Sequence, residues 1–314
     1  MKSMLIREES LPEVSSDYME RFLAGQLSKQ TRRAYAGDLR AFFEAMDVQN
    51  PWEVTSDQII DYRNRIMKFD EENGELLNAA TVSRKLSAIR SFYDFARAKR
   101  AVERNPADPR IVKSPKLEHI GRTKGLSNKE VRRLLEEPDR TTLRGKRDYA
   151  ILSLWANSGL RRAELAGLKV RHFGEERGHR VILFKGKGQR RRKIPIKPET
   201  HQAIEEYKRA SGRDFSDPDT PIFTPTTNNR TKETAKPLNP DSLWRMVKKY
   251  ARRAEIKGIS PHSFRVFAVT NSLDNGATYR QVQMMTGHAD PRTVEQYDRG
   301  RENLEKNAVY WIRF

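Results

Sequence analysis

The stretch Gly159-Leu160-Arg161-Arg162-Ala163-Glu164-Leu165 lies near the middle of the chain, where one predicted helix ends and another begins. Three further groups follow in the C-terminal part, in the order His262-Ser263-Phe264-Arg265, Gly287-His288 and Tyr297. Guanidinium groups stay charged and bind phosphate oxygens with paired hydrogen bonds. Histidine exchanges a proton near neutral pH, and tyrosine can act as a nucleophile. Together these residue types predict attack on a phosphodiester without a metal ion.

The positive charge of the chain is concentrated in its second part. Overall the sequence has 61 Lys and Arg residues against 42 Asp and Glu residues, a net charge of +19. Residues 1–118 hold 20 basic and 19 acidic side chains, whereas residues 119–314 hold 41 and 23. Within the first part, residues 84–116 carry 10 basic and 3 acidic groups. This uneven distribution favours a surface that follows a nucleic-acid backbone over a charge that only improves solubility.

Length and composition restrict the class of protein. A chain of 314 residues allows two domains, each with a core of its own. The sequence has no cysteine, which excludes zinc fingers, iron–sulfur clusters, disulfides and thiol chemistry. No apolar run approaches the ~20 residues needed to cross a bilayer, and residues 1–9 turn acidic too early for a signal peptide. We therefore expect a cytoplasmic protein with no membrane partner.

Residues 1–107 are predicted to form a helical N-terminal domain. Apolar residues recur at helical spacing in four segments, Ser28 is placed to cap the second helix, and Asn73-Gly74 breaks the chain before the last one. The aromatic residues at the apolar positions are interpreted as core. Basic side chains between them in the last helix are interpreted as contacts to DNA phosphates, namely Arg84, Lys85 and Arg90.

A basic, extended linker is expected over residues 108–122, after Asn105-Pro106-Ala107-Asp108-Pro109 ends the first domain. Residues 123–314 are predicted to form the second domain, in which helices flank two strands joined by the turn Gly186-Lys187-Gly188. The predicted fold is mostly α, with a small β-sheet in the second domain. Helices are expected over 127–137, 145–158, 199–211, 240–254, 262–274, 278–285 and 301–312, with another from about 162, and strands over 181–184 and 193–196.

These motifs together resemble those of the tyrosine recombinases, the family that includes phage integrases, the Xer proteins and Cre. The resemblance extends from Ser28-x-x-Thr31-x-x-x-Tyr35-x-x-Asp38-Leu39 to the C-terminal residues. It implies a helical core-binding domain followed by a mixed α+β catalytic domain. The chain departs from many members at Val266, where they carry His or Arg, but that position is not a catalytic one.

The resemblance also implies the catalytic residues. The Gly-Leu-Arg segment supplies the first arginine, the Gly-Lys-Gly turn the lysine, and the His-x-x-Arg box and Gly-His pair the remaining cationic groups, with the nucleophile nine residues after the last histidine. One carboxylate, a helical turn beyond the first arginine, would orient the site without touching phosphate. The implied catalytic set is Arg161, Lys187, His262, Arg265, His288 and Tyr297, and the orienting carboxylate is Glu164.

Each of these roles is chemically reasonable. A tyrosine phenol has a pKa near 10, so His262 is expected to take its proton. The two arginines would stabilise charge on the non-bridging oxygens, His288 would donate a further hydrogen bond, and Lys187 would protonate the leaving oxygen. A turn lysine taken alone is more often merely solvated, and several neighbours could equally bind phosphate, namely Arg190, Arg191 and Arg192. No carboxylate cluster resembles a two-metal site, so no metal ion or cofactor is expected.

The expected function is therefore site-specific cleavage and rejoining of DNA through a covalent 3′-phosphotyrosine. Two alternatives remain open at this stage: a sequence-specific DNA-binding protein that has lost its chemistry, and a type IB-like topoisomerase that relaxes supercoils. The resemblance implies double-stranded DNA with a short inverted-repeat site as the partner, and a homotetramer that exchanges strands through a Holliday junction.

The last residues carry one further expectation. In the helix predicted over 301–312, apolar residues share one face, at Leu304, Ala308, Trp311 and Ile312. This face must be buried, either on its own domain or, as the family implies, on a neighbouring protomer through exchange of the C-terminal helix.

Overall fold

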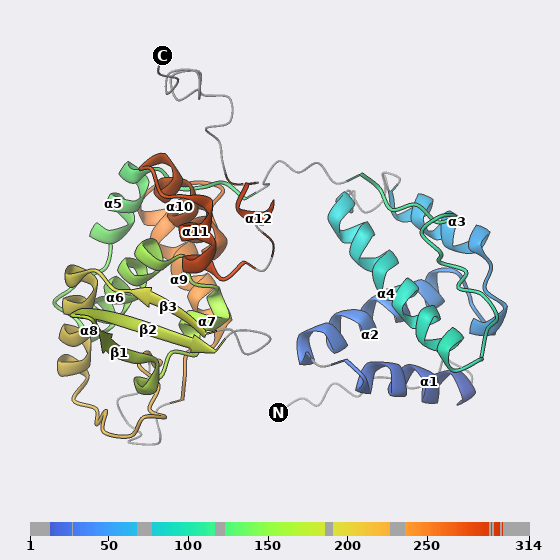
Figure 1. Cartoon of the computed structure of the whole chain (residues 1–314), viewed down its shortest axis with the longest axis horizontal. Coiled ribbons are helices and arrows are strands. Elements are labelled where there is room, and N and C mark those ends of the chain that lie inside the picture. The colour runs from blue at the N-terminus through green and yellow to red at the C-terminus, as the bar shows by residue number, and fades with distance from the viewer. Residues whose placement is uncertain are drawn as a thin grey trace, which may run out of the picture. The chain divides into compact units, whose positions relative to one another are not determined.

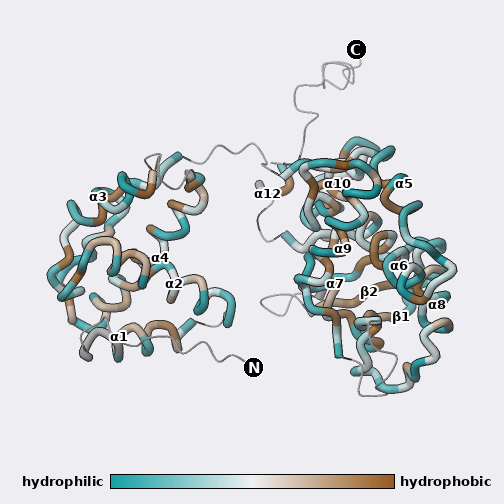
Figure 2. Tube along the Cα trace, turned by 180° about the vertical axis from the view of Figure 1, so that it is seen from behind, coloured by the Kyte–Doolittle hydropathy of each residue, from teal (hydrophilic) through white to brown (hydrophobic). Residues whose placement is uncertain are grey.

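The structure is a computed structural model that describes residues 13–26, 28–67, 77–116, 123–185, 191–226, 236–288, 290, 292–295 and 297. The chain divides into two compact units, residues 1–118 and 119–314, coloured from blue to green and from green to red in Figure 1. Each unit has its own hydrophobic core, as expected for two domains. Along the helices of both units, hydrophobic stretches alternate with hydrophilic ones (Figure 2).

The regular elements in the described residues of the first unit are all helices, as the sequence predicted. Side chains of Phe22, Phe43 and Phe92 meet at its centre, with ring centroids 5.7–5.8 Å apart in tilted, edge-to-face pairs. The predicted cap is confirmed, because the Ser28 hydroxyl accepts a hydrogen bond from the backbone N–H of Thr31. The helices are α1 (Glu13–Ala24), α2 (Lys29–Ala45), η1 (Pro51–Glu53), α3 (Ser56–Met67) and α4 (Ala79–Ala98).

The segment after α4 packs against the first unit and is not a free linker from residue 108 onward. Ala107 and Val112 are fully buried in the core of this unit. The Arg90 guanidinium donates hydrogen bonds to their carbonyl oxygens at 2.9 and 3.2 Å. Since these contacts order residues 107–112, the compact unit extends beyond the domain end expected at residue 107.

The second unit combines helices with a small antiparallel sheet. The predicted capping box at its first helix is confirmed, since Ser127 and Glu130 exchange hydrogen bonds. Its first elements are α5 (Asn128–Glu136), α6 (Leu143–Ser158), α7 (Arg162–Ala166), η2 (Val170–His172), β1 (Phe173–Glu176), β2 (His179–Lys185) and β3 (Arg191–Pro195). The remaining helices are α8 (Pro198–Ser211), α9 (Pro240–Arg253), α10 (Pro261–Asp274), α11 (Tyr279–Thr286) and α12 (Arg292–Glu295).

The sheet has the order β1-β2-β3, and β1 was not predicted from the sequence. Ile182 lies opposite Ile194 in the β2–β3 ladder, and both side chains are buried. Helix α6 is buried nearly all round, and its Trp155 stacks on Phe264 of α10 with ring centroids 5.4 Å apart. Because α6 is packed on nearly all of its faces, its C-terminal end is held in place. The motif that begins at Gly159 follows directly after that end.

Helices α10, α11 and α12 lie together at one end of the second unit and α11 contacts β3 (Figure 1). The C-terminal segments of the chain are thereby brought to the sheet. The helix expected over 301–312 and the turn 186–188 fall outside the described residues. In the described part of the chain, no helix has the length and apolar character required to cross a membrane.

Candidate active site

Gly159 has a left-handed backbone conformation and brings the segment that contains Arg161 into contact with the segment that contains Arg265. Gly159 ends α6 with a φ of +59°, and a Cβ there would lie 3.0 Å from the Cβ of Ala268. Glycine therefore satisfies both the backbone conformation and the close approach of α10. The Gly159 carbonyl accepts a hydrogen bond of 2.8 Å from Nη1 of Arg265. Two motifs that are far apart in the sequence, at 159–165 and 262–265, thus meet at this turn.

Arg265 is a buried cation held by carbonyl groups. Arg265 lies on α10 and is only 2% exposed. Its Nη2 donates a second hydrogen bond of 2.8 Å to the carbonyl of Thr286. Burial, followed by the charge of Arg161, lowers the pKa of Arg265 to about 10, so it stays charged at neutral pH. No carboxylate in the described ranges forms an ion pair with it. Carbonyl oxygens orient the guanidinium but leave its charge available for an anion.

His288 is held as a neutral imidazole with a defined tautomer. Nη2 of Arg265 lies 2.8 Å from Nε2 of His288, and Nδ1 lies 3.0 Å from Oγ1 of Thr286. Because arginine only donates, Nε2 must be the acceptor and Nδ1 carries the proton. Burial, with a contribution from Arg265, lowers the pKa of His288 to about 4. In this arrangement Nε2 accepts from Arg265, so the hydrogen bond that His288 was expected to donate to phosphate requires a different protonation pattern.

Tyr297 lies directly against both histidines. Its hydroxyl oxygen is 3.2 Å from Nε2 of His262, and its ring stacks on His288 at a centroid distance of 6.1 Å. Burial raises the pKa of Tyr297, and the charges of Arg265 and Arg161 act in the opposite direction. Burial also lowers the pKa of His262, and the same two arginines lower it further. A protonated phenol thus faces a neutral imidazole, which is the arrangement required for proton transfer from tyrosine to histidine.

Glu164, the carboxylate that the resemblance implies as orienting the site, contacts Arg161. Its carboxylate accepts hydrogen bonds from the backbone N–H of Arg161 at 2.8 Å and from its Nη1 at 3.2 Å. Burial alone would raise the pKa of Glu164. Hydrogen bonds from Arg192 and from the Arg161 backbone outweigh that effect, so the pKa is lowered and the carboxylate stays charged.

Arg192, which was expected to contact DNA from the surface, is buried inside the site. The residue is 9% exposed, and its Nη2 donates to Glu164 at 2.8 Å. The alternation of side chains along a strand could have indicated this burial, because Arg192 lies on the same inward face of β3 as the buried Ile194. Lys187 and Arg190 lie outside the described residues, as does the side chain of Arg191.

The three basic residues of α4 that were expected to bind DNA differ in their surroundings. Arg84 is exposed but forms an ion pair with the buried Asp38, which Lys85 also approaches at 3.5 Å. Arg90 is half-buried, and its guanidinium donates hydrogen bonds to the carbonyl groups of Ala107 and Val112, which ties it to the core of the first unit. Helical spacing could have indicated this, since Arg90 follows Leu86 by four positions.

A cavity of about 250 Å³ is lined by both Arg161 and Arg265. Trp244 of α9 forms part of its wall and is 44% exposed, with Nζ of Lys248 5.6 Å from its ring centroid. Trp244 was not among the site residues predicted from the sequence, because a tryptophan at helical spacing is usually a buried core residue. Its exposure beside cationic groups is typical of a ring that stacks on a nucleic-acid component. The cavity is lined by Leu160, Arg161, Arg162, Trp244, Ser260, Pro261, His262 and Arg265.

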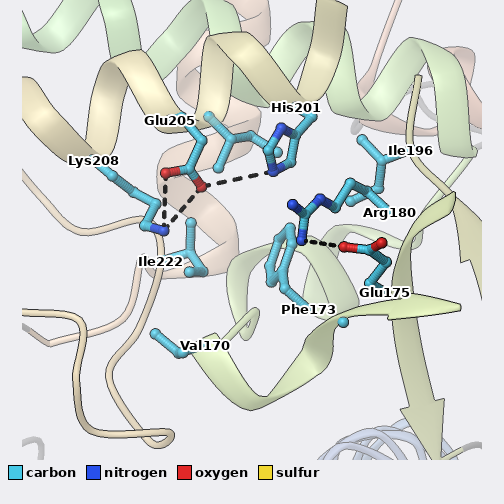
Figure 3. Close-up of a pocket in the computed structure, with 11 residues that line it drawn as sticks. Val170, Phe173, Glu175, Arg180, Ile196, His201, Glu205, Lys208 and Ile222 are labelled. Atoms are coloured by element: carbon cyan, nitrogen blue, oxygen red, sulfur yellow. Dashed lines mark hydrogen bonds and ion pairs between the residues drawn. The ribbon is translucent and has the colours of Figure 1, made fainter. Parts of the chain in front are cut away.

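A second cavity, of about 210 Å³, lies between the sheet and α8 and contains none of the expected catalytic residues (Figure 3). Its charged groups neutralise one another. Arg180 pairs with Glu175 at 2.9 Å, and Glu205 pairs with Lys208 at 2.9 Å and approaches His201 at 3.9 Å. Over the residues that the structure describes, no group of three or more His, Cys, Asp or Glu side chains could hold a metal ion.

Sequence comparison relates both units to known proteins. Residues 124–303 match the phage integrase family, and residues 17–100 match the phage integrase N-terminal SAM-like domain. A tyrosine recombinase of Synechococcus elongatus is 29% identical over 299 residues, which cover 92% of this chain and 90% of the relative. The tyrosine recombinase XerC of Pelobacter propionicus is 31% identical over 272 residues, covering 86% of this chain and 85% of that protein.

Solved structures share the fold. A lambda integrase tetramer bound to a Holliday junction superposes with a TM-score of 0.70 at 16% identity, covering 94% of this chain and 80% of the integrase. The XerH site-specific recombinase bound to a palindromic difH substrate gives 0.66 at 18% identity, covering 89% and 79%. The matched domains, together with a tyrosine that faces histidines and arginines at their predicted positions, show that this chain belongs to the phage integrase family and is a tyrosine site-specific recombinase.

Proposed function

We propose that the protein cleaves and rejoins DNA through a covalent bond between Tyr297 and a 3′-phosphate, without metal or ATP. The observation that carries the proposal is the distance of 3.2 Å between the Tyr297 hydroxyl and Nε2 of His262, beside two arginines. Those arginines, Arg161 and Arg265, line the same cavity as His262, so a phosphate in it would face all three groups. Nucleophile, base and anion-binding groups therefore converge on one position.

The proposed reaction conserves bonds in number and kind. His262 takes the phenolic proton, the Tyr297 oxygen bonds to phosphorus, and the bond from phosphorus to the 5′ oxygen breaks. Arg161 and Arg265 stabilise the charge that grows on the non-bridging oxygens. Lys187 is proposed, from its motif, to protonate the leaving oxygen. One phosphoester replaces another of similar energy, so the same steps in reverse reseal the strand without ATP.

The partners are proposed from charge and relatives. Residues 119–314 carry 41 basic and 23 acidic side chains, a surplus suited to a phosphate backbone. The exposed Trp244 would add a stacking surface next to the scissile phosphate. From the lambda integrase tetramer on a Holliday junction and the XerH complex with a palindromic substrate we infer a homotetramer on a short inverted-repeat site. Exchange of the C-terminal helix is proposed from the apolar face expected over residues 301–312. Action on DNA supports a cytoplasmic location.

The decisive experiment tests Tyr297 as the nucleophile. Tyr297→Phe removes one oxygen, so DNA binding should persist while covalent attachment to a nicked suicide substrate disappears. The adduct is detected as a slowly migrating band on a denaturing gel. Tyr279→Phe, a change of the same kind on the exposed face of α11, is the matched control and should leave the adduct intact. An adduct formed by the Tyr297→Phe protein would refute the assignment.

A further inference from the structure

Arg192 forms contacts with both halves of the anion-binding site. Its Nη2 donates to Oε2 of Glu164 at 2.8 Å, and its Nη1 donates to the carbonyl of Thr286 at 2.7 Å. The same Oε2 accepts from the backbone N–H of Arg161, and the same carbonyl accepts from Nη2 of Arg265. One guanidinium thus shares an acceptor atom with each of the two catalytic arginines.

This position is costly for a cation. Arg192 is 9% exposed, it pairs with one carboxylate that also serves Arg161, and its Nε has no hydrogen-bond partner among the described residues. Burying an incompletely satisfied charge opposes folding, so stability alone does not explain the arginine. The flat guanidinium also lies over the ring of Phe184, with Cζ 4.9 Å from the ring centroid, which fixes its plane.

The neighbouring backbone is fitted to this side chain. Gly287 ends α11 with a φ of +66°, and a Cβ at that position would lie 2.8 Å from Nη1 of Arg192. The absence of a side chain therefore lets the guanidinium reach the Thr286 carbonyl. That carbonyl precedes His288 by two residues, so Arg192 also fixes the end of the helix that presents the second histidine.

We propose that Arg192 is a positioning residue for cleavage: it holds Glu164 and the Thr286 carbonyl in place so that Arg161 and Arg265 converge on the scissile phosphate. Arg192 itself does not touch the DNA. Because Arg192 lies on β3, it also ties that strand to α7 and α11. The proposal rests on the proposed function, since it concerns how the two catalytic arginines reach the phosphate.

The test compares two substrates that differ in charge at the scissile position. A methylphosphonate replaces one non-bridging oxygen by a methyl group, so less negative charge needs stabilisation when Tyr297 attacks. On ordinary DNA, Arg192→Ala should form adduct about 100- to 1,000-fold more slowly than wild type, as expected when an anion-stabilising group is lost. On the methylphosphonate, the same variant should come to within about tenfold of wild type. Binding to a half-site should change only a few-fold.

Two further variants make the result interpretable. Lys193→Ala is the matched control, because Lys193 is the next residue of β3, points to the opposite face and pairs with Glu176. It should cleave both substrates like wild type. Arg192→Lys keeps the charge and most of the volume but has a single nitrogen, which cannot bridge Glu164 and Thr286 as the two Nη atoms do. It should show the same substrate-dependent defect, and it serves if the alanine variant fails to fold.

The outcomes separate the two proposals. Equal losses on both substrates for both Arg192 variants would overturn the positioning role and reduce Arg192 to a general stabiliser of the fold. Wild-type rates for both variants would overturn it as well. A loss of DNA binding that matches the loss of cleavage would instead make Arg192 a phosphate contact, against the proposal. If wild-type protein forms no adduct on ordinary DNA, the covalent mechanism itself has failed.

Discussion

Arg84 of the first unit and Arg265 of the second unit are held by opposite kinds of partner. In the first unit, Arg84 pairs with the buried carboxylate of Asp38. In the second unit, Arg265 is buried among carbonyl groups and an imidazole, and within the described ranges no carboxylate pairs with it. The carbonyl groups orient Arg265 and leave its charge available, whereas the buried carboxylate of Asp38 neutralises Arg84.

The two units also differ in net charge. Residues 1–118 are nearly neutral, and residues 119–314 carry almost all of the surplus positive charge. Around Arg265, burial and positive charge together lower the pKa of His262 and of His288, so both histidines stay neutral near pH 7. Among the residues that the structure describes, arginines therefore carry the positive charge of the site, and the histidines remain able to accept protons.

The largest expected effect contrasts an arginine from each unit. Arg265→Ala should slow adduct formation by about 100- to 1,000-fold, because its charge is needed most in the transition state, while half-site affinity falls far less. Arg84→Ala should leave the cleavage rate of bound DNA near wild type, since Asp38 already neutralises that arginine. Single-turnover cleavage at saturating protein, together with equilibrium binding in a salt series, measures both quantities. Equal losses of affinity and rate for Arg265→Ala would make it an ordinary backbone contact.

An intermediate effect is expected from pH. Because burial and arginine charge lower the pKa of His262 below its usual 6.5, the neutral form that accepts the Tyr297 proton persists into mildly acidic solution. Cleavage at subsaturating DNA should hold steady from pH 7.5 to 6.5 and fall by about tenfold per unit only below the lowered pKa. Single-turnover rates between pH 5 and 8 give the profile.

The control for this profile is His262→Gln, which has no titrating imidazole. Its rate should be low throughout and should lack the acid inflection. If the wild-type profile already falls between pH 7.5 and 6.5, the pKa of the base is not lowered as its surroundings require, and a group other than His262 controls the step.

The sequence was sufficient to predict site residues where the chemistry allows few residue types. It was insufficient where packing in three dimensions decides the role of a residue. Arg161, His262, Arg265 and Tyr297 could be selected because few residues bind phosphate, move a proton or attack phosphorus, and the structure brings all four together. The helices of both units followed from apolar spacing and caps such as Ser127. What these patterns specify is local, and the helices expected between residues 127 and 285 begin and end within about two residues of their expected boundaries where both ends were predicted.

Other features depended on contacts that a linear pattern does not display. Strand β1 is short and includes two glutamates, so only its pairing with β2 makes it a strand. Arg192 stands within a run of basic residues, where any one of them reads as a surface charge, and its acceptors come from residues 164 and 286. Trp244 was not predicted to be a surface residue, because a tryptophan on an amphipathic helix is usually part of the core. In the structure it is 44% exposed.

The smallest effect concerns Arg90 and tests whether the first unit uses its arginines for folding. Arg90→Ala should lower the free energy of unfolding by roughly 1–3 kcal/mol, since the carbonyls of Ala107 and Val112 lose their donor in a buried segment. Affinity for a half-site and its dependence on salt should stay within a few-fold of wild type. Urea unfolding and a salt titration of DNA binding measure the two responses. A salt slope reduced by about one unit, with stability unchanged, would instead return Arg90 to the role of a phosphate contact.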